Sequence, residues 1–235
     1  GEEMSYFVIV DKNTHKFIGS AQDHKRVGEK DTGHNTGGMG AYSPSSILTN
    51  ELEKKIKEKI IEPTLSAMKK MGNPYRGFLY AGLMIIKNEP FLIEYNIRMG
   101  DPECQTIMTR LDSDLLKIIN LATNDKLSQI KINWKDKTSI CVVLCSNGYP
   151  ENYNKNIKIE KLNDIILDRD SFIFHAGTYE KEGNVFSNGG RVLNIVSLCK
   201  NILNARNKAI SYLNKINWKD GFFRKDIGWR IINNK

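Results

Sequence analysis

Short apolar runs separated by polar residues predict strands along the first half of the chain. Runs rich in Val, Ile, Phe and Tyr predict strands at 2–10, 77–86 and 91–97. The residues Lys87-Asn88-Glu89-Pro90 between the last two runs are typical of a turn. The pattern therefore predicts a hairpin over residues 77–97.

A period near four residues replaces the strand pattern after Thr49-Asn50, which is a suitable N-cap. Leu52, Ile56 and Ile60 predict an amphipathic helix that runs to Met71 and stops at Gly72. Pro63 is expected to break or kink this helix, because proline lacks an N–H group and clashes with the preceding turn. Two further helices are predicted at about 104–110 and 113–122.

The polar stretch 123–137 is interpreted as a boundary. Strands are predicted after it at 140–144, 157–159, 172–175, 185–186 and 192–196, with a hairpin turn at 182–184. A helix over about 198–215 follows, with Ile202, Ala205, Ala209 and Leu213 as its apolar stripe. We predict an α+β fold of two domains, residues 1–123 and residues 124–235.

Composition narrows the function classes. The 235 residues carry a formal charge of +8, but the lysines are scattered among Asn and Ile. A solvated basic surface or a phosphorylated substrate therefore explains the charge better than nucleic acid. A mean hydropathy of −0.43 without a long apolar run predicts no membrane-spanning helix. The acidic start lacks the apolar segment of a signal peptide, and four scattered cysteines predict free thiols in a reducing cytoplasm.

Glu94-Tyr95-Asn96 is a candidate metal site. Residues i and i+2 of a strand lie on one face, which would place a carboxylate and an amide oxygen together. Mg²⁺ is commonly held by one or two such oxygens, with substrate phosphates completing its shell. The apolar neighbours of Glu94 predict a partly buried charge with a partner, either a metal or Arg98. An ordinary exposed strand face is the alternative.

The polar stretch 22–46 contains five glycines and is expected to be a long loop. Within it, four glycines between Gly33 and Gly40 allow a ligand to approach the backbone closely, or mark a flexible linker. Lys25 and Arg26 of Asp23-His24-Lys25-Arg26 are suited to phosphate or carboxylate recognition, although a solvated turn is the more frequent explanation for such a run of charges. Residues 98–103 and 188–191 are similar polar loops.

Taken together, these segments resemble the phosphoribosylamine–glycine ligase (glycinamide ribonucleotide synthetase) family, from residue 1 to about residue 229. The segments are Gln22-Asp23-His24-Lys25-Arg26, Asp31-Thr32-Gly33, residues 35–44, residues 77–84, Glu94-Tyr95-Asn96-Ile97-Arg98, Gly100-Asp101-Pro102-Glu103 with Gln105, and residues 187–193. This family belongs to the ATP-grasp ligases. The resemblance implies the C-terminal part of an ATP-grasp core followed by a small α/β-mixed C-terminal domain.

The activity that the resemblance implies is the ATP-dependent joining of glycine to 5-phosphoribosylamine in purine biosynthesis. Glu94 and Asn96 match the metal-ligand positions for Mg²⁺ or Mn²⁺, and Arg98 and Asp101 would be catalytic. The glycine and phosphoribosylamine pocket would be lined by Asp23, His24, Lys25, Arg26, Asn35, Thr36, Gly37, Gly38, Glu103, Gly189, Gly190 and Arg191. Met84 and Leu92, on strands beside the metal pair, are candidates for nucleotide contacts.

The chain departs from the family pattern at several positions. His34 replaces a common Pro, which predicts a less rigid loop, and Tyr95, Met99 and Cys104 are tolerable replacements. The family's N-terminal portion and the lid over the ATP phosphates are not found in these residues, so the isolated chain is expected to be inactive. Another ATP-grasp carboxylate–amine ligase and a non-catalytic basic binding module are the remaining interpretations.

Overall fold

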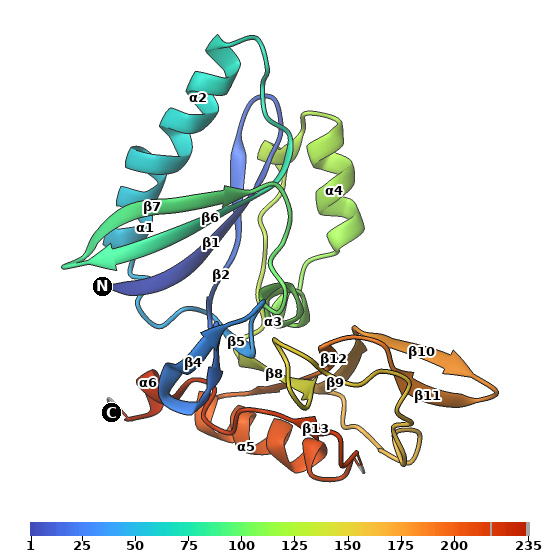
Figure 1. Ribbon diagram of the computed structural model, residues 1–235. Helices are drawn as coiled ribbons and strands as arrows, with labels where there is room; N and C mark the ends of the chain where they lie inside the picture. Colours follow the sequence, from blue (N-terminus) through green and yellow to red (C-terminus); the bar gives the residue numbers. More distant parts are fainter. Residues whose placement is uncertain (217, 234–235) are drawn as a thin grey trace. The chain divides into compact units, whose positions relative to one another are not determined.

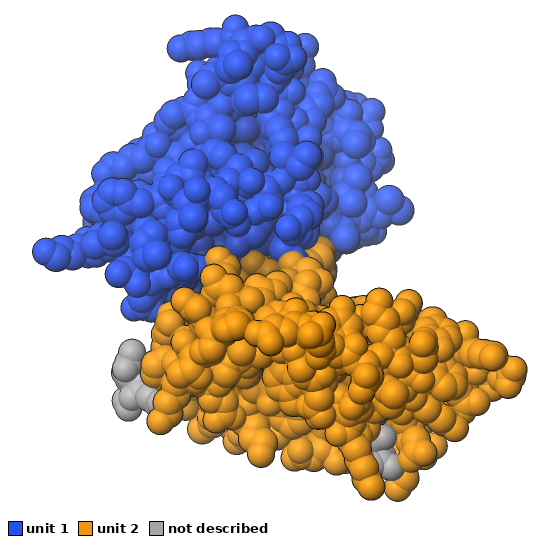
Figure 2. All heavy atoms as spheres, in the orientation of Figure 1, with its two compact units in different colours: residues 1–22, 43–100, 110–135 blue, residues 23–42, 101–109, 136–235 orange. Residues whose placement is uncertain are grey.

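The computed structural model describes residues 1–216 and 218–233 and confirms an α+β fold (Figure 1). The described residues form two compact units, coloured separately in Figure 2. Unit 1 contains residues 1–22, 43–100 and 110–135, and unit 2 contains residues 23–42, 101–109 and 136–235. The domain boundary predicted near residue 123 concerns the divisions of the family and stays a prediction.

Unit 1 is built on antiparallel strands in the order β7-β6-β1-β2. Their bounds are Glu89–Asn96 for β7, Gly77–Ile86 for β6, Glu2–Val10 for β1 and His15–Asp23 for β2. The strands predicted at 2–10 and 77–86 are therefore confirmed. The turn residues Lys87 and Asn88 have positive φ, so the second hairpin strand begins two residues earlier than expected.

One long helical segment covers one face of these strands (Figure 1). It consists of α1 (Asn50–Ile56), a π-helical turn (Lys57–Ile61) and α2 (Glu62–Lys70). The Thr49 side chain accepts a hydrogen bond from the Leu52 N–H, as an N-cap does. The expected interruption at Pro63 takes the form of the π-helical turn just before it, and the helix continues. Leu52, Ile56 and Ile60 belong to one buried core with Met4, Tyr6, Val8 and Val10 of β1.

Two further elements complete unit 1 after the strands. Helix α4 (Leu115–Thr123) begins at Asp114, whose side chain accepts from the Lys117 N–H, and a 3-10 turn spans Leu127–Gln129. The Asp11 carboxylate accepts hydrogen bonds from the N–H groups of Asn13, Thr14 and Leu127, which fastens this end of the unit.

The long loop expected over residues 22–46 is wrong, because most of this segment is ordered. Strands β3 (Arg26–Gly28) and β4 (Thr32–Asn35) pair around a 3-10 turn, and β5 (Gly40–Ser43) is buried. Backbone hydrogen bonds between residues 23–25 and 36–40 provide the order. The polar side chains of this segment do not predict strand pairing, because the hydrogen bonds that form it are made by the backbone.

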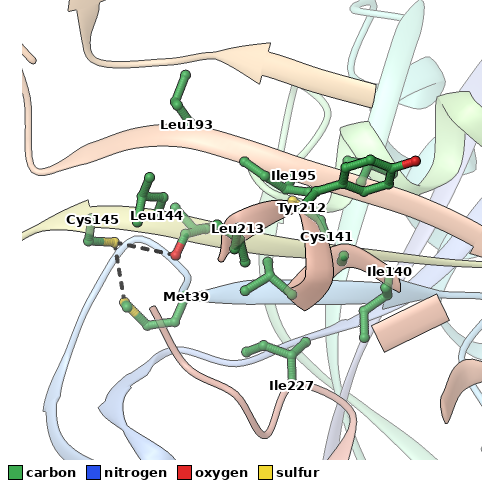
Figure 3. Packing of buried hydrophobic residues seen from close by; sticks show 14 of the residues in the cluster. Met39, Ile140, Cys141, Leu144, Cys145, Leu193, Ile195, Tyr212, Leu213 and Ile227 are labelled. Carbon is green, nitrogen blue, oxygen red and sulfur yellow. Dashed lines mark hydrogen bonds between the residues drawn. The ribbon is translucent and has the colours of Figure 1, made fainter. Parts of the chain in front are cut away.

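Unit 2 contains strands in the order β5-β8-β12-β9, and β13 pairs with β8. The bounds are Thr138–Ser146 for β8, Arg191–Cys199 for β12, Ser171–His175 for β9 and Gly221–Phe222 for β13. Helix α5 (Ile202–Leu213) packs its predicted apolar stripe against β8 and β12 (Figure 3). Helix α3 (Glu103–Arg110), the hairpin of β10 (Thr178–Lys181) and β11 (Asn184–Ser187), and α6 (Trp229–Asn233) complete the fold.

Three expectations in this half need correction. Residues 157–159 form an isolated bridge from Lys158 to Phe186, not a strand. Helix α5 starts at Ile202 because Leu198 and Cys199 extend β12. Strands β10 and β13 were not predicted, although Glu182 and Gly183, with positive φ, form the predicted hairpin turn. The four cysteines are free, and within the described residues no helix is long and apolar enough to cross a membrane.

Candidate functional site

Glu94 and Asn96 lie together on one face of β7. The Asn96 Nδ2 group donates to Glu94 Oε1 at 3.1 Å. Between them, the Tyr95 hydroxyl turns to the opposite face, where it donates to the Ile60 carbonyl and contacts Thr64 Oγ1. Glu94 and Asn96 therefore point away from the helices that cover unit 1.

The expected partial burial of Glu94 is wrong, since its side chain is exposed. The reason is that Glu94 points to the face of β7 opposite the helical segment 50–70, and burial of a strand side chain depends on what covers its face. Arg98 is exposed as well and donates to the Met99 carbonyl, so the expected partner of Glu94 is Asn96 instead.

The strand register places the two nucleotide candidates differently. Glu94 pairs with Gly82 and Asn96 with Tyr80, so Met84, two residues beyond Gly82, shares their face. A register shift after Gly82 pairs Leu92 with Leu83, which belongs to the buried core on the helix-covered face. The register thus supports Met84 beside the metal pair more strongly than Leu92.

The donor set of β7 fits a hard divalent cation. A carboxylate and a carboxamide oxygen can each bind Mg²⁺ or Mn²⁺, and the exposed face leaves room for waters and phosphates as further ligands. Among the described residues, no three His, Cys, Asp or Glu side chains gather as a self-sufficient metal site. A metal at Glu94 and Asn96 would thus depend on a substrate for several of its ligands.

In unit 2, the glycine-rich loop is fastened to the segment that precedes it. The Thr36 N–H and hydroxyl both donate to the Lys25 carbonyl, at 2.7 and 2.8 Å. The Gly38 N–H donates to Thr36 Oγ1, and Gly38 has a φ of +118° where an added Cβ would lie 2.6 Å from Pro102. The loop is therefore a defined backbone turn, not a flexible linker.

Arg191 clamps this loop to the residues that open α3. Its Nη1 donates to the Gly37 carbonyl at 2.7 Å and to the Asp101 carbonyl at 2.6 Å, while Nη2 donates to Asp101 Oδ2 at 2.9 Å. A Cβ added to Gly37 would lie only 3.0 Å from the Arg191 guanidinium carbon. Three separate predicted segments thus meet at one guanidinium group.

Tyr149, which the sequence did not single out, completes this cluster. Its hydroxyl accepts from the Gly37 N–H at 3.0 Å, and its ring lies against Gly190, where any side chain would clash. The Gly189 carbonyl accepts from Ser146 Oγ at 2.8 Å. His34 contacts Glu151 at 3.0 Å, so a side chain in the position of the usual Pro still holds the loop.

His24 lies inside unit 2 and is only 5% exposed. Its Nε2 accepts from the Gly228 N–H at 3.1 Å. Burial, together with the nearby Arg224, lowers the pKa of His24 to about 4. The buried imidazole is placed to support the loop, and the expected contact between His24 and substrate stays a prediction.

Asp31 is the centre of a buried ionic network below the same loop. Arg224, which is 1% exposed, donates to Asp31 Oδ1 and to both oxygens of Asp226, and Arg230 donates to Asp31 Oδ2. Burial opposes the ionised form of Asp31, but the hydrogen bond from Arg224 and the charges of Arg224 and Arg230 together lower its pKa. No motif pointed to Arg224, which joins the nearby Asp226 to Asp31, 193 residues away in sequence.

The remaining predicted residues fall into two groups. Arg26 and Asn35 are exposed and pair across the β3–β4 hairpin, and Arg26 also donates to the Gly33 carbonyl. Asp23 and Lys25 are partly exposed at the start of this hairpin. Glu103, in contrast, is 3% exposed in the first turn of α3, so its carboxylate faces the interior of unit 2.

Comparison with known families identifies both parts of the chain. Residues 1–104 match the ATP-grasp (A) domain of phosphoribosylglycinamide synthetase, and residues 139–230 match its C domain. Residues 94, 96 and 98 lie in the first match, and Arg191 lies in the second.

Curated relatives agree over the whole chain. Phosphoribosylamine–glycine ligase of Brucella melitensis is 47% identical over 99% of this chain and 54% of its own length. The chloroplastic phosphoribosylamine–glycine ligase of Arabidopsis thaliana is 48% identical over 100% of this chain and 45% of its own length. The chain thus spans about half the length of the curated relatives it matches.

Solved structures show the same relationship. Phosphoribosylamine–glycine ligase of Thermotoga maritima superposes with a TM-score of 0.86 at 32% identity, over 97% of this chain and 56% of that one. Biotin carboxylase of Campylobacter jejuni, at a TM-score of 0.67 and 17% identity over 99% of this chain and 51% of that one, shows the shared fold alone. The chain belongs to the phosphoribosylglycinamide synthetase family, with sequence of its ATP-grasp (A) domain and its C domain.

Proposed function

We propose that this chain contributes metal-binding and substrate-binding residues to a phosphoribosylamine–glycine ligase. The ligase would join glycine to 5-phosphoribosylamine at the expense of ATP. The glycine carboxylate takes the γ-phosphoryl group of ATP and becomes an acyl phosphate. The amine of phosphoribosylamine then attacks the acyl carbon, and the products are glycinamide ribonucleotide, ADP and phosphate.

The observation that carries this proposal is the pairing of Glu94 with Asn96 on an exposed strand face. The pair lies within a chain that is 45–48% identical to phosphoribosylamine–glycine ligases. Phosphoryl transfer needs positioned oxygen ligands and positive charge more than covalent help from the protein. A two-ligand site with an exposed Arg98 nearby in the sequence meets that need.

Glu94 and Asn96 would hold Mg²⁺ or Mn²⁺, which supplies charge neutralisation for the ATP phosphates. Arg98, which is exposed, would stabilise the transferring phosphoryl group or the acyl phosphate. Met84, and less favourably Leu92, would contact the nucleotide. These side chains belong to unit 1 and to the matched ATP-grasp domain.

The acceptor substrates would meet the loops of unit 2. The free edge of the Arg191 guanidinium favours an anionic group, either a carboxylate or a phosphate. Lys25 and Arg26 add positive charge, and Asp101 with Asp23 would face the amino group of a substrate. Asn35, Thr36, Gly37, Gly38, Gly189 and Gly190 would shape this surface, while His24 and Glu103 would support it from inside.

Several finer assignments belong to the same proposal. The domain boundary near residue 123 separates the ATP-grasp portion from the C-terminal domain. The N-terminal portion present in the relatives would supply the rest of the ATP site. The enzyme would act in the cytoplasm, without nucleic acid or membrane partners. The greater length of the relatives supports the assignment of an N-terminal portion.

The test is ligation by an enzyme of the relatives' full length that carries these 235 residues. Glu94→Gln and Asn96→Ala should each lower kcat on the order of 100-fold and weaken the Mn²⁺ dependence, since each removes one metal ligand. Glu89→Gln is the matched control on the same strand, because Glu89 pairs with Lys55 and Lys59 instead. Equal activity of wild type and Glu94→Gln would refute the metal assignment.

The same assay separates the alternatives. Ligation of another acid and amine pair, without glycine and phosphoribosylamine, would assign the chain to a different carboxylate–amine ligase. Salt-sensitive nucleic-acid binding with no ligation would favour a basic binding module.

A further inference from the structure

Gln105 is connected to the Arg191 clamp through one carboxylate. Its Nε2 group donates to Asp101 Oδ1 at 2.8 Å, while Arg191 Nη2 donates to Asp101 Oδ2 at 2.9 Å. Both oxygens of Asp101 are thus engaged, one by each partner. Gln105 is the third residue of α3 and lies four residues after Asp101, so the first turn of the helix sets the position of its amide.

The orientation of the Gln105 amide follows from the chemistry of its neighbour. An ionised carboxylate only accepts hydrogen bonds, so the amide must present its NH₂ group to Asp101. The consequence is that Gln105 Oε1 is buried without a hydrogen-bond partner. A buried carbonyl left unsatisfied is unfavourable, which indicates that the contact with Asp101 has a compensating role.

The contacts of Arg191 leave a defined part of the guanidinium available. Nη1 uses both hydrogens on the carbonyls of Gly37 and Asp101, and Nη2 uses one on the Asp101 carboxylate. Within the described part of the chain, the Nε–H and the second Nη2 hydrogen have no protein acceptor. These two parallel donors form the edge that binds carboxylate or phosphate oxygens in a bidentate manner. The side chain remains 22% exposed, so an anion can reach it.

We propose that Gln105 is a positioning residue, which acts through Asp101 to hold the free edge of Arg191 toward the carboxylate or phosphate group of a substrate. This inference rests on the proposed function for the identity of the substrate, but not for the anion site itself. Without Gln105, the Asp101 carboxylate can rotate, and Arg191 loses its fixed direction while keeping its charge.

The test measures sulfate binding to the 235-residue chain by NMR of the arginine Nε–H groups. Sulfate keeps its charge across the pH range used and imitates a phosphate group. Arg191→Lys identifies the Arg191 signal by its loss. Wild type should show a saturable shift of that signal. Gln105→Ala should weaken sulfate binding at least fivefold, with an unchanged circular dichroism spectrum. Gln129→Ala, at an exposed glutamine in unit 1, is the matched control.

Gln105→Glu supplies a readout that a merely structural role would not move. At pH 7.5 the introduced carboxylate repels Asp101, and sulfate binding should be as weak as in Gln105→Ala. Near pH 5 the introduced group becomes protonated beside Asp101 and can donate again, so binding should return toward the wild-type value. Equal sulfate affinity in wild type and Gln105→Ala, or no recovery in Gln105→Glu, would overturn the inference.

Steady-state kinetics of the full-length enzyme separate this inference from the proposed function. Gln105→Ala should raise the KM of one anionic substrate about tenfold with little change in kcat, and should add nothing in an Arg191→Ala background. Additive effects would contradict the relay through Asp101. Absence of ligation in wild type, with the sulfate results intact, would refute the proposed function alone.

Discussion

His24 and Arg191 both come from polar motifs of unit 2, but their side chains have different surroundings. The His24 imidazole is buried among Arg224, Asp31, Asp226 and Arg230, so its neutral form is favoured. Arg191 keeps one edge accessible and shares its other donors among carbonyls and a carboxylate. We therefore expect His24 to affect the stability of unit 2 and Arg191 to affect substrate binding.

The buried His24 predicts an acid-sensitive unit 2. Its folded pKa of about 4 lies below the unfolded value of 6.5, so the unfolded chain binds more protons between these values. This contribution to stability is complete above pH 6.5 and is lost as the pH falls toward 4. The slope should be on the order of 1 kcal/mol per pH unit.

Urea denaturation between pH 4.5 and 7 measures this slope. His24→Gln should flatten the dependence of the unfolding free energy on pH. His15→Gln provides the comparison in unit 1, because burial lowers the pKa of His15 as well. The carboxyl groups of Asp31 and Asp226 have lowered pKa values, so their contributions are lost only below this window. An unchanged slope in His24→Gln would contradict the assignment.

We predict that Gly37 is needed for anion binding because a side chain there would press against Arg191, not because of its backbone conformation. Gly37→Ala places a Cβ 3.0 Å from the Arg191 guanidinium carbon and should displace that group from Asp101. We expect weaker sulfate binding by at least fivefold and a loss of about 1 kcal/mol in the free energy of unfolding. Gly183→Ala is the control: it has a φ of +72° and no atom near its Cβ, so it should lower stability without changing sulfate binding.

At the scale of elements, the helical segment 50–70 is determined by local sequence, whereas the exposure of β7 is determined by its surroundings in the fold. The helical segment 50–70 has its cap, its apolar spacing and its basic last turn encoded locally. Strand β7 presents Phe91, Leu92 and Ile93 to solvent at 54%, 43% and 51% exposure. Its apolar composition is typical of a buried strand, but the exposure of these side chains depends on what packs against each face of the sheet.

The cap of α1 gives a direct stability prediction. Thr49→Ala removes the hydroxyl that accepts from the Leu52 N–H and should destabilise unit 1 by about 1 kcal/mol. Thr49→Ser should restore most of the loss, because serine offers the same acceptor. Chemical denaturation of the three proteins measures the difference, and equal stability of Thr49→Ala and wild type would show that the cap contributes nothing.

At the scale of the whole molecule, each unit has its own hydrophobic core. The core of unit 1 lies between β1, β6 and the helical segment 50–70. The core of unit 2 surrounds β8 and β12, with Met39 and Cys145 in contact as Figure 3 shows. The ionic network of Arg224 belongs to unit 2 and ties residue 31 to residues 224–230.

Loss of this network should therefore affect unit 2 first. Arg224→Met leaves Asp31 and Asp226 without their shared cation and should cost about 3 kcal/mol. Hydrogen exchange should accelerate in β3, β4 and β12 more than in β1 and β6. A double variant with Asp31→Asn and Asp226→Asn should recover part of the loss, since it removes the uncompensated charges. Uniform acceleration in both units would contradict a local role.

The candidate site could be predicted in part. The motifs identified Glu94, Asn96, Gly37, Asp101 and Arg191, because each lies in a polar segment of unusual composition within an apolar pattern. Gln105 appeared only as part of a segment that resembles the family, without a predicted role. Tyr149 and Arg224 gave no local signal, since their importance comes from contacts with residues more than 100 positions away in sequence.

The amino-acid sequence alone determined the local elements and their chemistry: the hairpin of β6 and β7, the helical segment after Thr49, and oxygen ligands two residues apart on one strand. These follow from interactions among residues near each other in the chain. The tertiary structure decided which side chains are buried and which meet. The ordered β3–β4 hairpin, the exposure of Glu94 and the enclosure of His24 arise from long-range backbone pairing and packing, which no local pattern of polarity records.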